Sequence, residues 1–352
     1  LSGGIDSAAV VAFSSEILNG RNAQTFTVGF EDETFDERKF ANLVAKTFGT
    51  KHQTRIVGLD DARTTLPEIY RRLDEPIADG SLLPMHMVSR LASERVTVAL
   101  SGDGGDELFA GYDPFTALRL AKIYQQIAPE FLRGTLQYIS RALPLSEQNM
   151  SFDFKLRRAL RGTNHGPGLW NPLWLAPASV EEIKNVTGMR HEPENLYQDV
   201  IALWHECESE NLVDRSLEFY ANYYLEGVLT KVDRASMLCG LEVRSPFLDV
   251  DLVEFALRLP PSVKLHLGTG KWLLKKALSE LLPREILRRP KKGFGVPTVK
   301  WFRDLPVPTR VKTERLGLNW DVLMEYRQRQ LRGKSDHRGV LWAWSALDMS
   351  LT

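Results

Sequence analysis

Two short glycine-bordered segments contain most of the residues whose types could do chemistry. The first is Ser2-Gly3-Gly4-Ile5-Asp6-Ser7, which runs directly into the apolar residues of a predicted helix. Glycines let a backbone approach an anion closely, and the free N–H groups at a helix start donate to it along the helix dipole. The segment can therefore cradle phosphate groups, and Asp6 could hold an accompanying metal ion. On these residues alone, a plain turn in which Asp6 and Ser7 only cap the helix is equally open.

The second segment, Ser101–Tyr112, reads SGDGGDELFAGY and follows a predicted strand. Its acids Asp103, Asp106 and Glu107 are crowded among glycines, and such crowding is costly unless a cation compensates it. Parallel α/β sheets bind their ligands at the carboxyl ends of strands, which is where this segment falls. The pattern favours a cation-dependent site over a hairpin turn. Its spacing does not fit a calcium-binding EF-hand loop.

A third glycine-containing stretch does not complete a nucleotide motif. The ordinary phosphate loop ends in Gly-Lys-Ser or Gly-Lys-Thr, whereas Gly268-Thr269-Gly270-Lys271 is followed by Trp272. The absence of that loop argues against transfer of a γ-phosphate. His205 and Cys207 lie two residues apart, so a helix would point them to different faces, and we do not expect a zinc site.

The elements that must position the two segments alternate in the first third of the chain. β-branched runs predict strands at Thr25–Phe30, His52–Val57 and Val96–Leu100. Apolar spacings of three and four predict helices at Asp6–Leu18, Phe35–Phe48, Asp60–Leu73 and Pro84–Glu94. This alternation is typical of a parallel sheet covered by helices. Because a ligand loop in such a sheet normally follows a strand, we expect the first strand to precede Leu1.

Beyond Tyr112 the pattern changes to helices separated by proline and glycine. We therefore expect an α/β core over residues 1–112 and a mainly helical remainder over residues 113–352. Within that remainder, Asn149–Pro177 is rich in Gly, Pro and Trp and is predicted to be a long loop.

Composition narrows the classes of function. Lys plus Arg and Asp plus Glu each number 45 in 352 residues, so the formal net charge is zero and favours neither nucleic acid nor a membrane as partner. No apolar run approaches the length of a membrane span. Cys207 and Cys239 are too few for a disulfide framework, which fits a reducing, cytoplasmic compartment. A small-molecule substrate is the expectation that follows.

Taken together, the two segments resemble the synthetase domain of the asparagine synthetase (glutamine-hydrolysing) family over nearly the whole chain. Further matching stretches are Thr27–Phe30, Asp74-Glu75-Pro76 through Pro84, Lys231–Arg234, Leu241–Asp249 and Arg289–Phe294. The resemblance implies an ATP-pyrophosphatase fold of the adenine nucleotide α hydrolase-like type. It also implies a ligase that activates a carboxylate, most simply the side chain of aspartate, as an acyl-adenylate. Ammonia from glutamine would then displace AMP and give asparagine, AMP and pyrophosphate.

The resemblance assigns site residues one by one. It implies ATP and Mg²⁺ as cofactors, with a pyrophosphate loop at Ser2, Gly3, Gly4, Asp6 and Ser7. It places adenosine contacts at Leu1, Val28, Ser101 and Gly102. Asp6 and Asp106 match the magnesium carboxylates. Asp103, where many relatives have Glu, matches the acid that guides adenylate formation and the attacking amine, and Lys291 matches the lysine that neutralises the reacting phosphate.

Several alternatives stay open on the sequence. The basic run around Lys291 could be a solvated surface, and the family match favours function for that residue only. Arg234 and Arg244 could bind substrate or pair with neighbouring acids, and Asp249 reads as a helix cap. The same adenylation chemistry serves β-lactam synthetases, lasso-peptide cyclases and amidotransferases of surface material, and a catalytically silent interaction module is a rival of another class. We expect a glutaminase domain upstream on the same chain as a partner, while a homodimer is left open.

Overall fold

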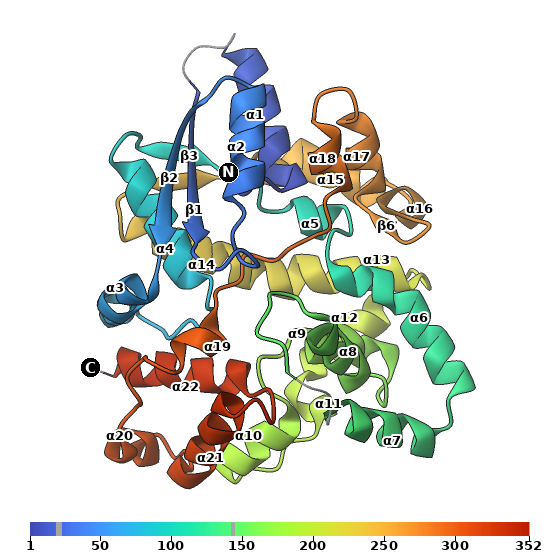
Figure 1. Ribbon diagram of the computed structural model, residues 1–352. Helices are drawn as coiled ribbons and strands as arrows, with labels where there is room; N and C mark the ends of the chain where they lie inside the picture. Colours follow the sequence, from blue (N-terminus) through green and yellow to red (C-terminus); the bar gives the residue numbers. More distant parts are fainter. Residues whose placement is uncertain (19–22, 142–144, 352) are drawn as a thin grey trace. The chain divides into compact units, whose positions relative to one another are not determined.

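The computed structural model describes residues 1–18, 23–141 and 145–351, which form two compact units (Figure 1). Unit 1 comprises residues 1–58, 81–116 and 216–295, and unit 2 comprises residues 59–80, 117–215 and 296–352. Both units therefore contain residues from either side of Tyr112, and the chain first passes from unit 1 to unit 2 after Gly58. The chain is a mixed α/β protein rich in helices.

Unit 1 begins with the predicted helix and strands. Helix α1 (Ile5–Ile17) precedes strand β1 (Gln24–Phe30), helix α2 (Arg38–Thr47) and strand β2 (Lys51–Val57). The two strands pair in parallel from Gln24 opposite Lys51 to Phe30 opposite Val57. A helical connection between parallel neighbours is what the alternating pattern predicts. These four elements confirm the sequence prediction to within a few residues.

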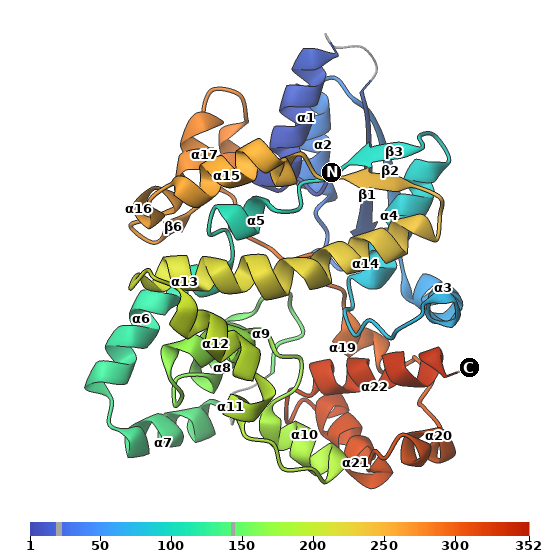
Figure 2. The ribbon, with the colours of Figure 1, turned by 180° about the vertical axis from the view of Figure 1, so that it is seen from behind.

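A second parallel pair in unit 1 joins distant parts of the sequence. Strand β3 (Val98–Leu100) pairs with β4 (Glu242–Arg244), as Figure 2 shows. Helix α4 (Leu82–Ser93) leads to β3, and α14 (Leu225–Met237) leads to β4. The sequence analysis missed β4, because three residues are too short to show a period of two.

The remaining elements of unit 1 are short and surround these strands. They are α5 (Gly105–Leu108), a π-helical turn (Tyr220–Tyr224), η3 (Pro246–Leu248), α15 (Val250–Arg258), α16 (Pro261–Lys264), β5 (Leu265–His266), β6 (Thr269–Gly270), α17 (Trp272–Ala277) and α18 (Arg284–Arg288). Helices α6 (Asp113–Ile127) and α13 (Leu212–Phe219) carry the chain between the two units.

The core of unit 1 explains why α1 is fixed in place. Ile5, Ala8, Ala9 and Ala12 follow the three-and-four spacing of one helical face, and all are buried. They share a cluster with residues from α2, α5, η3, α15, α18 and the segments next to α5 and before α18. These are Val44, Leu108, Phe109, Phe247, Ala256, Leu278, Leu282 and Ile286. Small alanines let the neighbouring elements approach closely, so the start of α1 is held rigidly.

The regular elements that the structure describes in unit 2 are all helices. Its elements are α3 (Leu59–Arg72), α7 (Glu130–Arg141), α8 (Phe152–Arg161), η1 (Pro167–Leu169), α9 (Trp170–Leu175), α10 (Val180–Thr187), α11 (Pro193–Leu196), α12 (Gln198–Glu206), α19 (Thr298–Trp301), α20 (Arg310–Arg315), α21 (Trp320–Leu331) and α22 (Arg338–Ser350). Helix α3 packs against α22, and α7 packs against α8. Along the described ranges, none of the helices is long and apolar enough to span a membrane.

The prediction of a long loop at Asn149–Pro177 is wrong. Two helices and a 3₁₀ turn occupy most of that range, and Trp170 and Trp174 are buried with their rings stacked at 5.9 Å. Their indole N–H groups donate to the carbonyls of His165 and Ala159. The glycines and prolines therefore mark the ends of short helices, while the tryptophans supply the apolar core between them.

Gly3 offers a test of how tightly the first loop is packed. Its φ is +70°, and a Cβ there would lie 2.6 Å from the Phe40 Cβ and 2.7 Å from the Ala41 nitrogen. Gly49 has a similar φ of +64° but open space around it. We expect Gly49→Ala to cost about 1–2 kcal/mol of unfolding free energy through backbone strain alone, and Gly3→Ala to cost roughly 1–3 kcal/mol more through the clash. Urea unfolding of both variants measures the difference, and equal losses would contradict this account.

Candidate functional site

The first predicted segment forms a closed loop at the start of α1. The Ser2 backbone N–H donates to the Ser7 hydroxyl at 3.2 Å, and the Gly4 N–H donates to the Ser2 hydroxyl at 3.2 Å. Gly4 is the N-cap of α1, and no side chain caps this helix. The alternative in which Asp6 and Ser7 merely cap the helix is therefore wrong. An uncapped helix start next to a glycine loop is suited to an anion.

The second predicted segment touches the first. A Cβ on Gly102 would lie 2.7 Å from the Ser7 nitrogen, and one on Gly105 would lie 2.6 Å from Asp6 Oδ1. Any larger residue at these two positions would push the loops apart. The glycines thus have a steric purpose, which is to bring the acids of both loops together.

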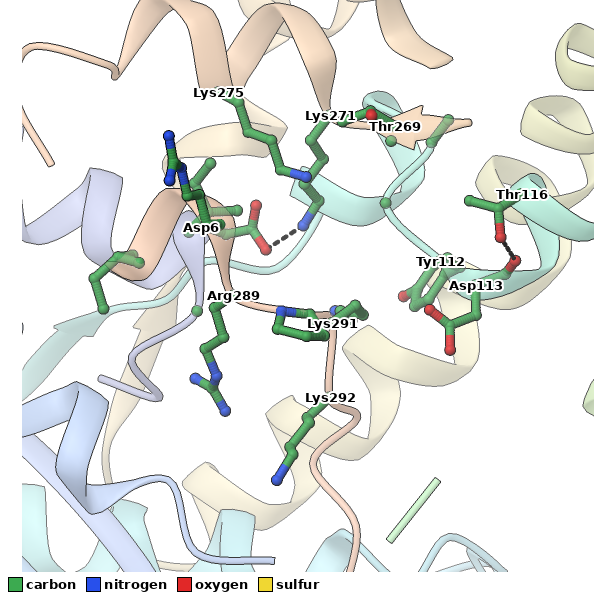
Figure 3. Close-up of a pocket in the computed structure, with 18 of the residues that line it drawn as sticks. Asp6, Tyr112, Asp113, Thr116, Thr269, Lys271, Lys275, Arg289, Lys291 and Lys292 are labelled. Atoms are coloured by element: carbon green, nitrogen blue, oxygen red, sulfur yellow. Dashed lines mark hydrogen bonds and ion pairs between the residues drawn. The ribbon is translucent and has the colours of Figure 1, made fainter. Parts of the chain in front are cut away.

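Two carboxylates and two ammonium groups meet where the loops touch. Lys271 Nζ forms ion pairs with Asp6 and with Asp106, the latter at 2.6 Å, and Lys291 Nζ forms a further ion pair with Asp106. The Lys271 side chain is 5% exposed, and those of Asp6 and Asp106 are 13% and 12% exposed. Figure 3 shows the Lys271 ammonium directed at Asp6. This group of four residues is called the charge cluster below.

The acids of the charge cluster differ in their proton affinity. Burial raises the pKa of Asp6, against the opposing effect of the Lys271 ammonium. Burial would also raise the pKa of Asp106, but the ammonium groups of Lys271 and Lys291 outweigh it and hold that pKa well below its usual range. In return, Asp106 raises the pKa of Lys291 although burial would lower it. Asp106 is thus held as a carboxylate.

A cavity of about 310 Å³ opens beside the charge cluster (Figure 3). Its lining combines the first loop, the glycines of the Gly-Thr-Gly-Lys stretch and a set of cationic side chains. The cationic residues are Lys271, Lys275, Arg288, Arg289, Lys291 and Lys292. Such a lining suits a compact polyanion, and we call this space the cationic cavity.

A second cavity of about 510 Å³ adjoins the first, since Ser2 and Glu37 line both. It contains the four residues that the sequence assigned to adenosine, and we call it the larger cavity. These are Leu1, Val28, Ser101 and Gly102, and the cavity is also lined by Ser2 and Ser7 of the first loop and by Asp103. Apolar side chains of α1, β1 and α4 complete the wall, including Val10, Phe26, Met85 and Val88. The structure thus places the predicted residues other than Gly3 and Asp106 on two neighbouring cavities of one unit.

Asp103 and Asp106 lie on one loop but have different surroundings. Asp103 lines the larger cavity, and its Oδ2 is buried without a hydrogen-bond partner among the described residues. Its backbone carbonyl accepts a hydrogen bond from the Ser245 hydroxyl. Gly104, at φ +90°, turns the chain between the two acids. The loop therefore separates the two carboxyl groups.

Lys271 and the pair Glu37–Arg289 belong to the site, although the sequence pattern did not predict them as site residues. Arg289 is 6% exposed, forms an ion pair with Glu37 and lies over the Phe40 ring at 4.3 Å. Its guanidinium also donates to the Ser2 carbonyl at 3.3 Å, which ties the basic run to the first loop. The Gly-x-Gly-Lys stretch is a usable signal for Lys271, although it does not match the ordinary phosphate loop.

The basic run is therefore only partly the solvated surface that its charge suggests, because Arg284 and Arg288 are exposed but the later basic residues of the run are not. Arg289 and Lys291 are turned toward acids of the site, and Lys292 Nζ donates to the Thr34 carbonyl at 3.2 Å. In contrast, Arg244 is 72% exposed and pairs with Glu242, and Arg234 lies 4.0 Å from Asp233. Asp249 caps α15 as predicted, because its side chain accepts the Asp251 N–H.

The charge cluster fits a magnesium ion better than a structural metal. Within the described ranges no three His, Cys, Asp or Glu side chains are grouped as metal ligands. Mg²⁺ commonly takes only one or two protein carboxylates and completes its shell with phosphates and water. Asp6 Oδ1 is buried and lacks a hydrogen-bond partner within the described residues, so it has a free acceptor for such an ion.

The fold and the site together define a class of protein. It is a helix-rich α/β protein with an uncapped helix start, two glycine loops and a buried charge cluster beside a cationic cavity. A family model described as asparagine synthase matches residues 1–348. The chain belongs to the asparagine synthase family.

Individual relatives agree with this membership. Three of them carry the words asparagine synthetase (glutamine-hydrolyzing) in their names. A protein of Mycobacterium tuberculosis (strain ATCC 25618 / H37Rv) is 34% identical over 97% of this chain and 52% of its own length. One of Bacillus subtilis (strain 168) is 30% identical over 86% and 47%, and one of Rattus norvegicus is 26% identical over 87% and 41%. The chain thus spans about half the length of the curated relatives it matches.

Proposed function

We propose that this chain is an ATP-dependent, amide-forming synthetase that activates a carboxylate as an acyl-adenylate. The observation that carries the proposal is the charge cluster between two glycine loops, with a cationic cavity on one side and a larger, partly apolar cavity adjoining it. Family membership supports the same reaction, since the relatives are named asparagine synthetases. The fold would then be of the ATP-pyrophosphatase type, and the compartment cytoplasmic.

In this proposal ATP spans the two cavities. The adenosine enters the larger cavity, where Leu1, Val28 and Gly102 offer apolar surface and backbone groups. The phosphates lie on the first loop and the start of α1, whose dipole and N–H groups favour an anion. The cationic cavity takes the pyrophosphate, because its lysines and arginines balance the charge that builds up when the bond between the α and β phosphates breaks.

Asp6 and Asp106 would hold the magnesium ion. When bound, that ion stabilises negative charge on the phosphate oxygens. The chain's own contribution is to keep Asp106 ionised through the ammonium groups beside it, and to bring the two acids close together through the glycines at 102 and 105. Lys291 is 32% exposed and lies over the Tyr112 ring at 5.3 Å, so it can reach the reacting phosphate from the wall of the cavity.

Asp103 would serve the second half of the reaction. Its free carboxylate oxygen in the larger cavity can accept a proton or a hydrogen bond from an attacking amine. The acceptor carboxylate is most simply the side chain of aspartate, as the names of the relatives suggest. Ammonia released from glutamine would then give asparagine and AMP.

Pyrophosphate release tests the proposed activity. With Mg²⁺, ATP and ammonium salt, we expect release that depends on added aspartate. Lys291→Leu should lower the rate by about a hundredfold or more, because a preorganised charge at the reacting centre is worth roughly 3 kcal/mol. Lys276→Leu, an exposed lysine of α17, is the matched control and should keep the rate. Pyrophosphate release that depends on a different carboxylate would show that aspartate is not the substrate. Intact ATP binding without any pyrophosphate release would favour a silent interaction module.

Asp103 has its own test, because the proposal separates its role from that of Asp106. Asp103→Asn should impair pyrophosphate or amide formation while ATP binding stays nearly intact, and Asp103→Glu should be milder. Asp106→Asn should instead weaken binding of Mg-ATP. Calorimetric titration with Mg-ATP, run beside separate assays of the two products, distinguishes these roles. Equal loss of ATP binding in both Asn variants would show that Asp103 is a metal ligand.

We also propose that the core at residues 1–112 includes a strand formed by residues that precede Leu1, and that a glutaminase domain lies upstream on the same chain. The strand is supported by the pairing of the described strands, because β1 and β3 belong to separate two-stranded sheets. The Leu1 amino group already donates to the Phe26 carbonyl at 2.7 Å, in the manner of a strand neighbour. Val98 and Leu100 of β3 are 48% and 53% exposed, which is unusual for apolar residues of a sheet in an α/β protein.

Charge substitutions in the full-length protein test this strand. If a preceding strand covers β3, Leu100→Lys should destabilise the protein by about 2 kcal/mol or more, as burial of an unpaired polar group does. Leu257→Lys on α15, where the leucine is 57% exposed, should change stability by no more than about 0.5 kcal/mol. Equal and small effects of the two substitutions would mean that β3 is an open edge.

A further inference from the structure

Lys271 occupies the position where the proposed function needs a metal ion. Its ammonium contacts one oxygen of Asp6 and one of Asp106, the two carboxylates assigned to magnesium. The side chain is 5% exposed, so water does little to screen these contacts. An ammonium group and a divalent cation cannot both sit between the same two carboxylates.

The backbone around Lys271 is strained in a way that delivers this side chain. Lys271 has a φ of +55° and Ala110 a φ of +53°, a region that residues other than glycine rarely adopt. The Lys271 N–H donates to the Phe109 carbonyl at 2.9 Å, which ties the two strained segments together. Strain of this kind persists only where the surrounding structure enforces it, and it gathers at functional sites.

Two glycines make room for the same side chain. A Cβ on Gly111 would lie 2.1 Å from Lys271 Cε and 2.0 Å from Asp106 Oδ1. A Cβ on Gly270 would lie 2.3 Å from the Ala110 carbonyl oxygen. All three distances are too short for a real Cβ atom, so only glycine at these two positions leaves room for Lys271 to approach the carboxylates. A lysine with a purely packing role would need neither the strained backbone nor the two glycines.

We propose that Lys271 is the internal counter-ion of the metal site and couples metal binding to nucleotide binding. In the protein without nucleotide, its ammonium neutralises Asp6 and Asp106 and competes with a free divalent cation. The same side chain lines the cationic cavity, so phosphate groups entering there offer it new acceptors and release the carboxylates. The metal ion therefore binds more tightly when the nucleotide is bound, and the nucleotide binds more tightly when the metal ion is bound. This inference rests on the proposed function, because it takes Asp6 and Asp106 as the metal carboxylates.

Mn²⁺ alone is the probe that tests the coupling, with its free concentration followed by electron paramagnetic resonance. Lys271→Met should bind Mn²⁺ more tightly than the wild type in the absence of nucleotide, by roughly 5- to 150-fold, the usual range for coupled sites. By the same linkage, a methylene analogue of ATP that resists cleavage between the α and β phosphates should enhance Mn²⁺ binding less in this variant. Lys276→Met, on the exposed face of the same helix, is the control and should match the wild type.

The outcomes separate failure of this inference from failure of the proposed function. Unchanged or weaker Mn²⁺ binding by a folded Lys271→Met protein would overturn the counter-ion role. If that variant does not fold, Lys271→Gln, which keeps a donor toward the acids, must show the same gain, and absence of the gain overturns the role equally. If Asp106→Asn combined with Lys271→Met leaves Mn²⁺ affinity undiminished, the carboxylates are not the metal site, and the proposed function loses its metal assignment as well.

Discussion

The arrangement of unit 1 depends on balancing buried charge. Two carboxylates and two ammonium groups lie together in the charge cluster, and three of the four side chains are less than 15% exposed. Removing ionised groups from water costs several kcal/mol each, and the cost is recovered only when opposite charges are close and well oriented. None of the four groups can therefore be understood alone. Their mutual distance is a requirement of the fold as much as of the chemistry.

Every nearby element contributes to meeting that requirement. Alanines on α1 allow tight packing, which fixes the helix start that carries Asp6. Pairing of β3 with β4 fixes the beginning of the loop that carries Asp106, since the Ser101 N–H donates to the Arg244 carbonyl at 2.8 Å. Strained backbone before α17 brings in Lys271. Segments far apart in sequence thus converge on a single point, and the glycines at that point mark the closest approaches.

Local features of this site were predictable from sequence because their causes are local. Helix periodicity and β-branched runs located α1, β1, α2 and β2, and glycines next to acids marked both loops. The strand β4 was not predictable, because it is defined by its distant partner β3. The pair Glu37–Arg289 was not predictable for the same reason, because it is defined by a contact far along the chain. Lys271 does follow a local Gly-x-Gly-Lys signal, but its partners Asp6 and Asp106 are distant in sequence. The loop predicted at Asn149–Pro177 failed for a different reason. Its glycines and prolines suggested a loop, but burial of the tryptophans of α9 favours helices there.

Under the proposed function, placing two acids on one loop resolves a conflict between the tasks proposed for them. A metal carboxylate must stay ionised, and Lys271 and Lys291 hold Asp106 in that state. An acid that assists an attacking amine must instead keep a free oxygen, which the ammonium groups would otherwise occupy. Gly104 allows both acids within four consecutive residues, because its φ of +90° turns the backbone between them and leaves Asp103 on the wall of the larger cavity. A Cβ at this position would lie 2.4 Å from the Leu248 side chain, so η3 enforces glycine there. The separation of the two acids is therefore a consequence of packing, which explains how one short loop can serve two cavities.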